Sequence, residues 1–227
     1  MPPANSLVLF DIDGTLLRRA GPHHRLAIVE AVRKVTGLDT TTDGVPVAGM
    51  LDIGIIEAML RNAGVKRAFI RESMPAIVAA AERAHLRTCP LIHRRVCPGV
   101  RGLLRRLVRQ GAVTGLVTGN LTRIGWNKMR QAGLSEFFRF GEFGETAPTR
   151  AALVRNAVRR ARREGWISRE ARVTLIGDHI NDILAARANR VQSIAVGTGI
   201  LSLHQLAEHR PDILVPDMRS ISLDALL

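Results

Sequence analysis

The chain contains no tyrosine, and aromatic residues make up only 4% of its 227 positions. Few rings are therefore available to stack on the bases of single-stranded nucleic acid. It also lacks any apolar run near the roughly 18 residues that a membrane-spanning helix needs, so we expect no membrane partner. Only two cysteines occur, Cys89 and Cys97. We expect free thiols, a reducing cytoplasmic location and no secretory leader.

Lysine is almost as scarce, so the formal net charge of +13 comes almost wholly from arginine. The three lysines are Lys34, Lys66 and Lys128. A positive field attracts anions, from phosphorylated metabolites to nucleic acid. Four arginines are spaced to share one helix face, namely Arg155, Arg159, Arg162 and Arg163. We favour a solvated basic surface and keep nucleic-acid binding on a degenerate hydrolase scaffold as an alternative.

Short apolar runs that end in polar turns alternate with segments of helical period. The expected strands are Leu7–Phe10, Ala112–Val117, Val173–Ile176, Ser193–Val196 and Ile213–Val215. The expected helices are Val100–Gln110, Ile124–Ala132, Arg150–Glu164 and Asp182–Ala188. This alternation predicts an α/β fold with a doubly wound parallel sheet, in which polar turns converge on one site at the carboxyl ends of the strands.

The alternation lapses between residues 18 and 94, where the pattern is helical throughout. The expected helices are His24–Thr36, Asp52–Asn62 and Ala68–Arg87, with Asp52 as an N-cap. We therefore predict a helical unit of residues 18–94, inserted into a core made of residues 1–17 and 95–227.

Asp11 and Asp13 follow the first apolar strand and precede Gly14-Thr15. A carboxylate can attack phosphorus and form an aspartyl-phosphate, while its second oxygen holds a metal that offsets charge repulsion. A second carboxyl nearby can protonate the leaving oxygen and then activate water. We predict Asp11 as the nucleophile and Asp13 as the general acid and base.

The segment Phe10-Asp11-Ile12-Asp13-Gly14-Thr15-Leu16 resembles the first motif of the haloacid dehalogenase-like (HAD) hydrolase superfamily. The likeness covers essentially the whole chain and implies a Rossmann-like core with a helical cap inserted after this motif. The stretch Gly49–Ile56 resembles the cap of the phosphoglycolate phosphatase-like branch, although Leu51 replaces a threonine. An aspartate at the position of Asp13 implies phosphoryl transfer rather than dehalogenation.

The later motifs of that superfamily imply further site residues. Thr118 and Gly119 match the second motif, which binds phosphate oxygens. Asp178 and Asp182 match the fourth motif, G-D-x-x-x-D. The resemblance implies Mg²⁺ as cofactor, held by Asp11, Asp178 and the Asp13 carbonyl, with Asp182 in a supporting role.

The third motif usually supplies a lysine, and none occurs in the stretch that ends at Arg150. We predict that Arg150 takes over its electrostatic role, because a guanidinium stays charged and pairs with phosphate. Lys128 is a poorer candidate for that role. Arg18, Arg19, His23 and His24 follow the first motif closely, but we expect them to be solvated.

These observations predict a magnesium-dependent phosphatase acting on a small phosphorylated metabolite through an aspartyl-phosphate. A sugar phosphomutase of the same superfamily would use the same first-motif residues and remains the alternative within the enzyme class. Substrate identity and oligomeric state do not follow from the sequence.

Overall fold

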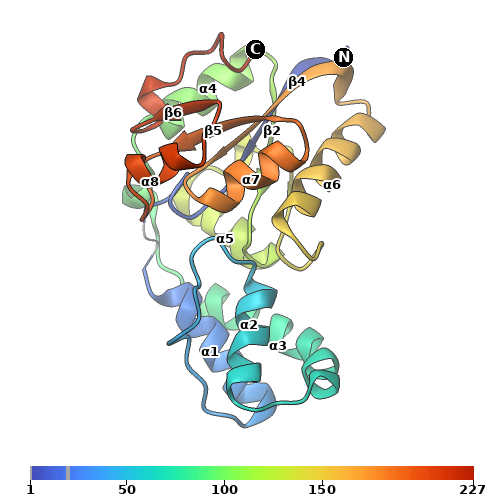
Figure 1. Cartoon of the computed structure of the whole chain (residues 1–227), viewed down its shortest axis with the longest axis vertical. Helices are drawn as coiled ribbons and strands as arrows, with labels where there is room; N and C mark the ends of the chain where they lie inside the picture. Colours follow the sequence, from blue (N-terminus) through green and yellow to red (C-terminus); the bar gives the residue numbers. More distant parts are fainter. Residues whose placement is uncertain (1, 19–20) are drawn as a thin grey trace.

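A six-stranded parallel sheet in the order β3-β2-β1-β4-β5-β6 forms the centre of the protein (Figure 1). The computed structural model describes residues 2–18 and 21–227. The strands are β1 (Ala4–Phe10), β2 (Val113–Val117), β3 (Phe140–Glu142), β4 (Ile167–Gly177), β5 (Gln192–Val196) and β6 (Ile213–Val215). β1 pairs with both β2 and β4, which fits its fully buried apolar run. The predicted α/β fold is confirmed.

Helices cover both faces of this sheet. They are α4 (Val100–Arg109), α5 (Thr122–Ala132), α6 (Arg150–Arg163), α7 (Ile180–Ala188) and α8 (Leu203–Glu208). One apolar cluster joins α6 and α7 to one face of the sheet, through residues such as Leu153 and Ala186. Another joins α4 and α5 to the opposite face, through residues such as Leu104 and Met129.

A second group of helices lies at one end of the long axis, away from both chain termini (Figure 1). It consists of α1 (His23–Thr36), α2 (Asp52–Asn62) and α3 (Arg67–Thr88). These helices share an apolar cluster of their own, to which Ile124 of α5 and the N-cap residue Leu121 also belong. In the sequence, this group is inserted between β1 and α4. In space, it packs against α5 of the sheet domain. The division at residues 17 and 94 stays a prediction.

Two short elements were not predicted, β3 and α8. β3 has only three residues and includes Gly141, so neither an apolar run nor alternation marks it. The prediction that Asp52 caps α2 is wrong: Leu51 occupies the N-cap, and Asp52 is the first helical residue. Both cysteines are free thiols. Among the described helices, none combines the length and apolar character needed to traverse a bilayer.

Candidate active site

The turn after β1 lies against the turn after β4. Gly14 adopts a φ of 85°, in the left-handed region that favours glycine. A Cβ at this position would lie 2.1 Å from Asp178 Oδ2, so a larger residue would push the two turns apart. The Thr15 hydroxyl then donates to Asp178 Oδ1 at 2.7 Å. Asp11 and Asp178 therefore meet at one edge of the sheet, although they are far apart in sequence.

Three buried carboxylates gather at this edge. Asp11, Asp178 and Asp182 each place an oxygen within 4.8 Å of the others. Burial and the charges of Asp11 and Asp182 raise the pKa of Asp178 well above its ordinary value. Burial likewise raises the pKa of Asp182, against the opposing charge of Arg150. The cluster therefore carries more negative charge than its own arginine offsets.

Arg150 is buried at the first position of α6 and is the cation of this cluster. Its Nη1 lies 2.7 Å from Asp182 Oδ1 and 3.2 Å from Asp11 Oδ1. Burial would lower the pKa of Arg150, but the neighbouring carboxylates outweigh this and raise it. The structure thus brings Arg150 to the predicted nucleophile, where the third-motif cation was expected.

The donor set of this cluster fits a hard divalent cation such as Mg²⁺, which prefers carboxylate and carbonyl oxygens. Asp11 Oδ1 is buried and accepts no hydrogen bond, so beside its ion pair with Arg150 at 3.2 Å it can still act as a ligand. Asp182 is already engaged, because its Oδ2 accepts from the His179 N–H at 3.1 Å and its Oδ1 accepts from Arg150. The geometry therefore fits Asp11 and Asp178 as ligands and Asp182 as a support.

The turn after β2 carries the predicted phosphate-binding residues. Thr118 is fully buried, and its N–H donates to Glu142 O at 3.1 Å. Its hydroxyl oxygen accepts from Asn120 Nδ2 at 2.8 Å, which leaves the hydroxyl hydrogen for another acceptor. Gly119 lies beneath the loop before α2, because a Cβ there would be 2.2 Å from Met50 O. The inserted segment thus passes directly over this turn.

Asp13 lies on the other side of the pocket and pairs with Lys128. The Lys128 Nζ lies 2.6 Å from Asp13 Oδ2 and 2.8 Å from Asp13 Oδ1. The lysine side chain is 1% exposed, whereas 41% of the Asp13 side chain is exposed. Removal from bulk water pulls the pKa of Asp13 upward, but the charge and hydrogen bonds of Lys128 outweigh this and lower it to about 2.

Sequence reasoning missed this partner. The sequence motifs indicate Lys128 only as an alternative cation beside Asp11, and Arg150 occupies that place. A signal was nevertheless present, because Lys128 lies four residues after Ile124 and four before Ala132, both of which are buried. Residues at this spacing share one helix face, so the pattern places a lysine on the buried side of α5. A buried lysine needs an anionic partner.

His24 and Asp52 extend the network into the inserted helices. His24 Nδ1 lies 3.0 Å from Lys128 Nζ, and His24 Nε2 lies 2.8 Å from Asp52 Oδ2. Asp52 Oδ2 also accepts from the Leu121 N–H at 2.8 Å, at the start of α5. The expectation that His24 is solvated is wrong. Arg18 is exposed, and Arg19 lies outside the described residues.

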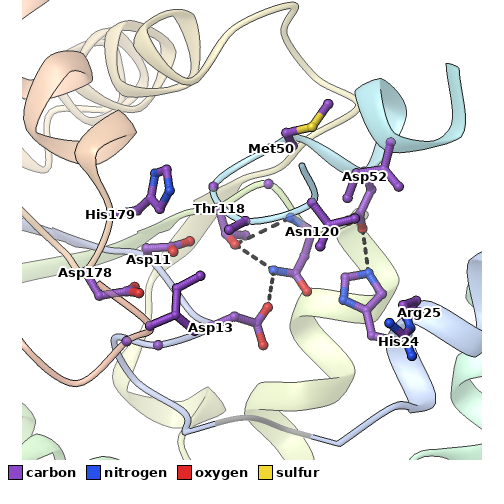
Figure 2. A pocket seen from close by; sticks show the side chains of 18 of the residues that line it. Asp11, Asp13, His24, Arg25, Met50, Asp52, Thr118, Asn120, Asp178 and His179 are labelled. Atoms are coloured by element: carbon purple, nitrogen blue, oxygen red, sulfur yellow. Dashed lines mark hydrogen bonds and ion pairs between the residues drawn. The ribbon is translucent and has the colours of Figure 1, made fainter. Parts of the chain in front are cut away.

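One cavity of about 970 Å³ is lined by members of both groups, Asp11, Arg150 and Asp178 of the first and Asp13, Lys128, His24 and Asp52 of the second. Figure 2 shows Asp11 and Asp178 on one side and His24 and Asp52 on the other, with Asp13 and Asn120 between them. The cavity wall combines residues of the turns that follow the strands with residues 47–50 and α1 of the inserted segment. The arrangement can hold a phosphoryl group beside Asp11 while the rest of a small molecule faces the inserted helices.

The four arginines predicted to share one face of α6 lie away from this cavity, unlike Arg150 at the start of the helix. Arg155, Arg159, Arg162 and Arg163 are all exposed, and none of them lines the cavity. Arg162 donates to Arg169 O, and Arg163 pairs with Glu164. This agrees with a solvated basic surface.

Comparisons with known proteins agree with this architecture. The family profile described as haloacid dehalogenase-like hydrolase matches residues 6–189. A phosphoglycolate phosphatase of Agrobacterium fabrum is 27% identical over 228 residues, which cover 97% of this chain and 92% of that protein. A phosphoglycolate phosphatase of Pseudomonas syringae pv. syringae is 26% identical over 223 residues, covering 95% and 78%.

Among solved structures, the chain is similar to β-phosphoglucomutase from Clostridium difficile. The TM-score is 0.73 at 17% sequence identity, with 98% of this chain and 95% of that chain covered. At this level of identity the similarity concerns the fold alone.

Proposed function

Because this chain belongs to the haloacid dehalogenase-like hydrolase family and is a phosphatase of that family, we propose that it hydrolyses a small phosphomonoester by attack of Asp11 on phosphorus. The observation that carries this proposal is the placement of Asp11. Its carboxylate is buried at the end of β1, beside one guanidinium and a second carboxylate, and lines the large cavity.

The reaction has two displacements. In the first, an Asp11 carboxylate oxygen bonds to phosphorus and the ester P–O bond breaks. Asp13, which must take up a proton when the substrate binds because Lys128 favours its ionised form, gives that proton to the leaving oxygen. In the second, Asp13 takes a proton from a water molecule as that water attacks phosphorus. The phosphoaspartate bond breaks, inorganic phosphate forms, and the Asp11 carboxylate is regenerated.

Arg150, Thr118 and Gly119 hold the phosphoryl group in this scheme. Arg150 offsets the charge of Asp11 and of the incoming phosphate, which would otherwise repel each other. The Thr118 hydroxyl and the Gly119 backbone bind phosphoryl oxygens. Mg²⁺, held by Asp11, Asp178 and the Asp13 carbonyl, would supply further charge neutralisation, while Asp182 fixes Arg150 and the α7 turn.

The substrate is a small phosphorylated metabolite. The curated relatives are phosphoglycolate phosphatases by name, so phosphoglycolate is the first compound to test. The cavity is bounded on one side by the inserted helices, and we propose that residues 18–94 act as a cap that opens for substrate and closes to exclude water. The core of residues 1–17 and 95–227 would carry the reacting groups.

A phosphate-release screen tests the proposal. Purified protein is incubated with phosphoglycolate and other monoesters, with Mg²⁺ or with a chelator, beside Asp11→Asn. We expect release that needs both Mg²⁺ and Asp11. Release that survives both changes contradicts the proposal.

The same assay separates the mutase alternative, which rests on shared first-motif residues. A mutase transfers the phosphoryl group to a second hydroxyl of a sugar phosphate instead of to water. Formation of an isomeric sugar phosphate without phosphate release would favour that alternative.

A further inference from the structure

We propose that Lys128 is a positioning residue that fixes the Asp13 carboxylate for proton transfer, and that His24 and Asp52 of the inserted helices orient its ammonium group. This inference rests on the proposed function of Asp13 and goes beyond it. Among the described side chains, Lys128 is the buried cation on the Asp13 side of the cavity.

The ammonium group of Lys128 is held by several hydrogen-bond acceptors. Besides both oxygens of Asp13, the Lys128 Nζ donates to Asn120 Oδ1 at 2.6 Å. Burying an ammonium group costs several kcal/mol unless it is paired and hydrogen-bonded. Lys128 is therefore held at its place by its partners, and Asp13 is held by Lys128.

The direction of the hydrogen bonds extends this network. An ammonium group can only donate, so His24 Nδ1 must accept from Lys128. The hydrogen of His24 is then on Nε2 and donates to Asp52 Oδ2. Asp52 is itself held by the Leu121 N–H. Donation thus runs outward from Lys128, to Asp13 on one side and through His24 to Asp52 on the other, and His24 and Asp52 anchor the ammonium group from the cap side.

Asn120 anchors Asp13 from a second direction. Its Nδ2 donates to Asp13 Oδ2 at 2.8 Å and to the Thr118 hydroxyl oxygen at 2.8 Å. The Asp13 carboxylate therefore accepts hydrogen bonds from two side chains, Lys128 and Asn120, yet 41% of the Asp13 side chain remains exposed. Proton transfer depends steeply on distance and orientation, so an anchored but accessible carboxylate is what the proposed reaction needs.

The network also joins two parts of the fold. Asp13, Asn120 and Lys128 come from the sheet side, whereas His24 and Asp52 belong to α1 and α2. The network is complete only when these helices are seated on α5. Positioning of Asp13 is thereby coupled to the seating of the cap.

The positioning role of Lys128 is tested by steady-state kinetics. The variants compared are Lys128→Met, Asp13→Asn and the double variant. Methionine keeps the length and apolar stem of the side chain but removes the ammonium group. We expect kcat to fall about 10- to 100-fold in Lys128→Met with KM changed less than about threefold, because orientation rather than substrate binding is lost. The double variant should be no slower than Asp13→Asn alone, since Lys128 acts through Asp13. Lys34→Met, an exposed lysine of α1, is the matched control.

Losses that multiply in the double variant, or a Lys128→Met enzyme with the wild-type kcat, would overturn the inference while leaving the proposed function intact. A wild-type enzyme that releases no phosphate would instead refute the proposed function, and this inference with it. If Lys128→Met does not fold, His24→Gln is measured in the same cycle with Asp13→Asn. We then expect a loss of kcat of about 3- to 10-fold that disappears in the Asp13→Asn background.

Discussion

On the β4 side of the cavity, three buried carboxylates face the guanidinium of Arg150, whereas on the α5 side one carboxylate, Asp13, faces the ammonium of Lys128. The pKa values follow this difference in charge. On the first side, burial and neighbouring carboxylates raise the pKa of Asp178. On the second, the charge and hydrogen bonds of Lys128 overcome the effect of burial and lower the pKa of Asp13 to about 2.

The contrast indicates what each side still needs. The α5 side is complete, because Asp13 already has a buried cation and hydrogen-bond donors, and Asp52 accepts from His24 and from the Leu121 N–H. The β4 side has an excess of negative charge in a buried place, which favours a bound cation and disfavours an approaching phosphate until that cation is present. We therefore assign metal binding to the β4 side and proton transfer to the α5 side.

Asp11→Asn should have the largest effect on activity. The amide cannot form the phosphoenzyme, so we expect phosphate release to fall by at least about 10³-fold. The same change removes one negative charge from the β4 side, so the metal-free variant should be at least as resistant to thermal unfolding as the wild type. An inactive variant that also unfolds earlier would contradict the charge argument.

Arg150→Met should come next. The change leaves three carboxylates without their arginine, so we expect kcat to fall about 100-fold. We also expect a loss of about 3 kcal/mol in unfolding free energy, because Asp182 loses its buried partner. Arg155→Met, an exposed arginine on the same helix, is the control and should change neither quantity. Near-wild-type activity of Arg150→Met would show that Arg150 is not the cation that offsets the charges of Asp11 and the phosphate.

Mg²⁺ should stabilise the protein in a manner that depends on pH. The folded-state pKa of Asp178 is raised above 3.8, so the folded state binds more protons than the unfolded state once the pH exceeds that value. The metal-free protein should therefore lose stability as the pH rises toward the raised pKa. Mg²⁺ supplies the missing charge, so its stabilising effect should grow with pH and reach about 2.7 kcal/mol at 100 times its Kd.

Thermal unfolding with and without Mg²⁺, at about pH 5 and about pH 8, measures this effect. Asp178→Asn should lose most of the Mg²⁺ stabilisation, while the exposed Asp43→Asn keeps it. Equal stabilisation of both variants would show that Mg²⁺ binds away from the β4 side.

The smallest effect should come from His85, which is buried on α3 beside the α5 side of the cavity. Burial, followed by the neighbouring His24 and Lys128, lowers the pKa of His85 to about 3. The folded state therefore binds fewer protons than the unfolded state between pH 6.5 and that value, and stability is lost as the pH falls through this window.

Chemical denaturation across this window compares wild type with His85→Gln. We expect the variant to lose about 1–2 kcal/mol less stability on acidification than the wild type, since glutamine does not titrate. His93→Gln, at an exposed position, should follow the wild type. Parallel curves for all three proteins would contradict the assigned environment of His85.

The fold and the residues of the β4 side could largely be predicted from the sequence, because the signals for them lie within short stretches of the chain. A buried run such as Leu7–Phe10 specifies a strand, and Asp11-Ile12-Asp13-Gly14 follows it without a gap. Asp178 follows another strand in the same way. Parallel topology alone then brings these turns together.

The pairing of side chains on the α5 side could not be predicted in this way. Its partners Lys128 and His24 lie 104 residues apart and belong to helices whose relative placement no local pattern specifies. The spacing of Ile124, Lys128 and Ala132 signals a buried lysine, but it does not say which carboxylate pairs with it. β3 was missed for a related reason, because three residues carry too little periodicity to identify a strand.

Covalent trapping tests the role of Asp11 most directly. The enzyme is mixed with a radiolabelled monoester that it hydrolyses, quenched with acid during turnover, and digested for peptide mapping. We predict label on the peptide that contains Asp11, and none in Asp11→Asn. Rapid turnover without labelled protein, or label on a peptide that lacks Asp11, would contradict the account.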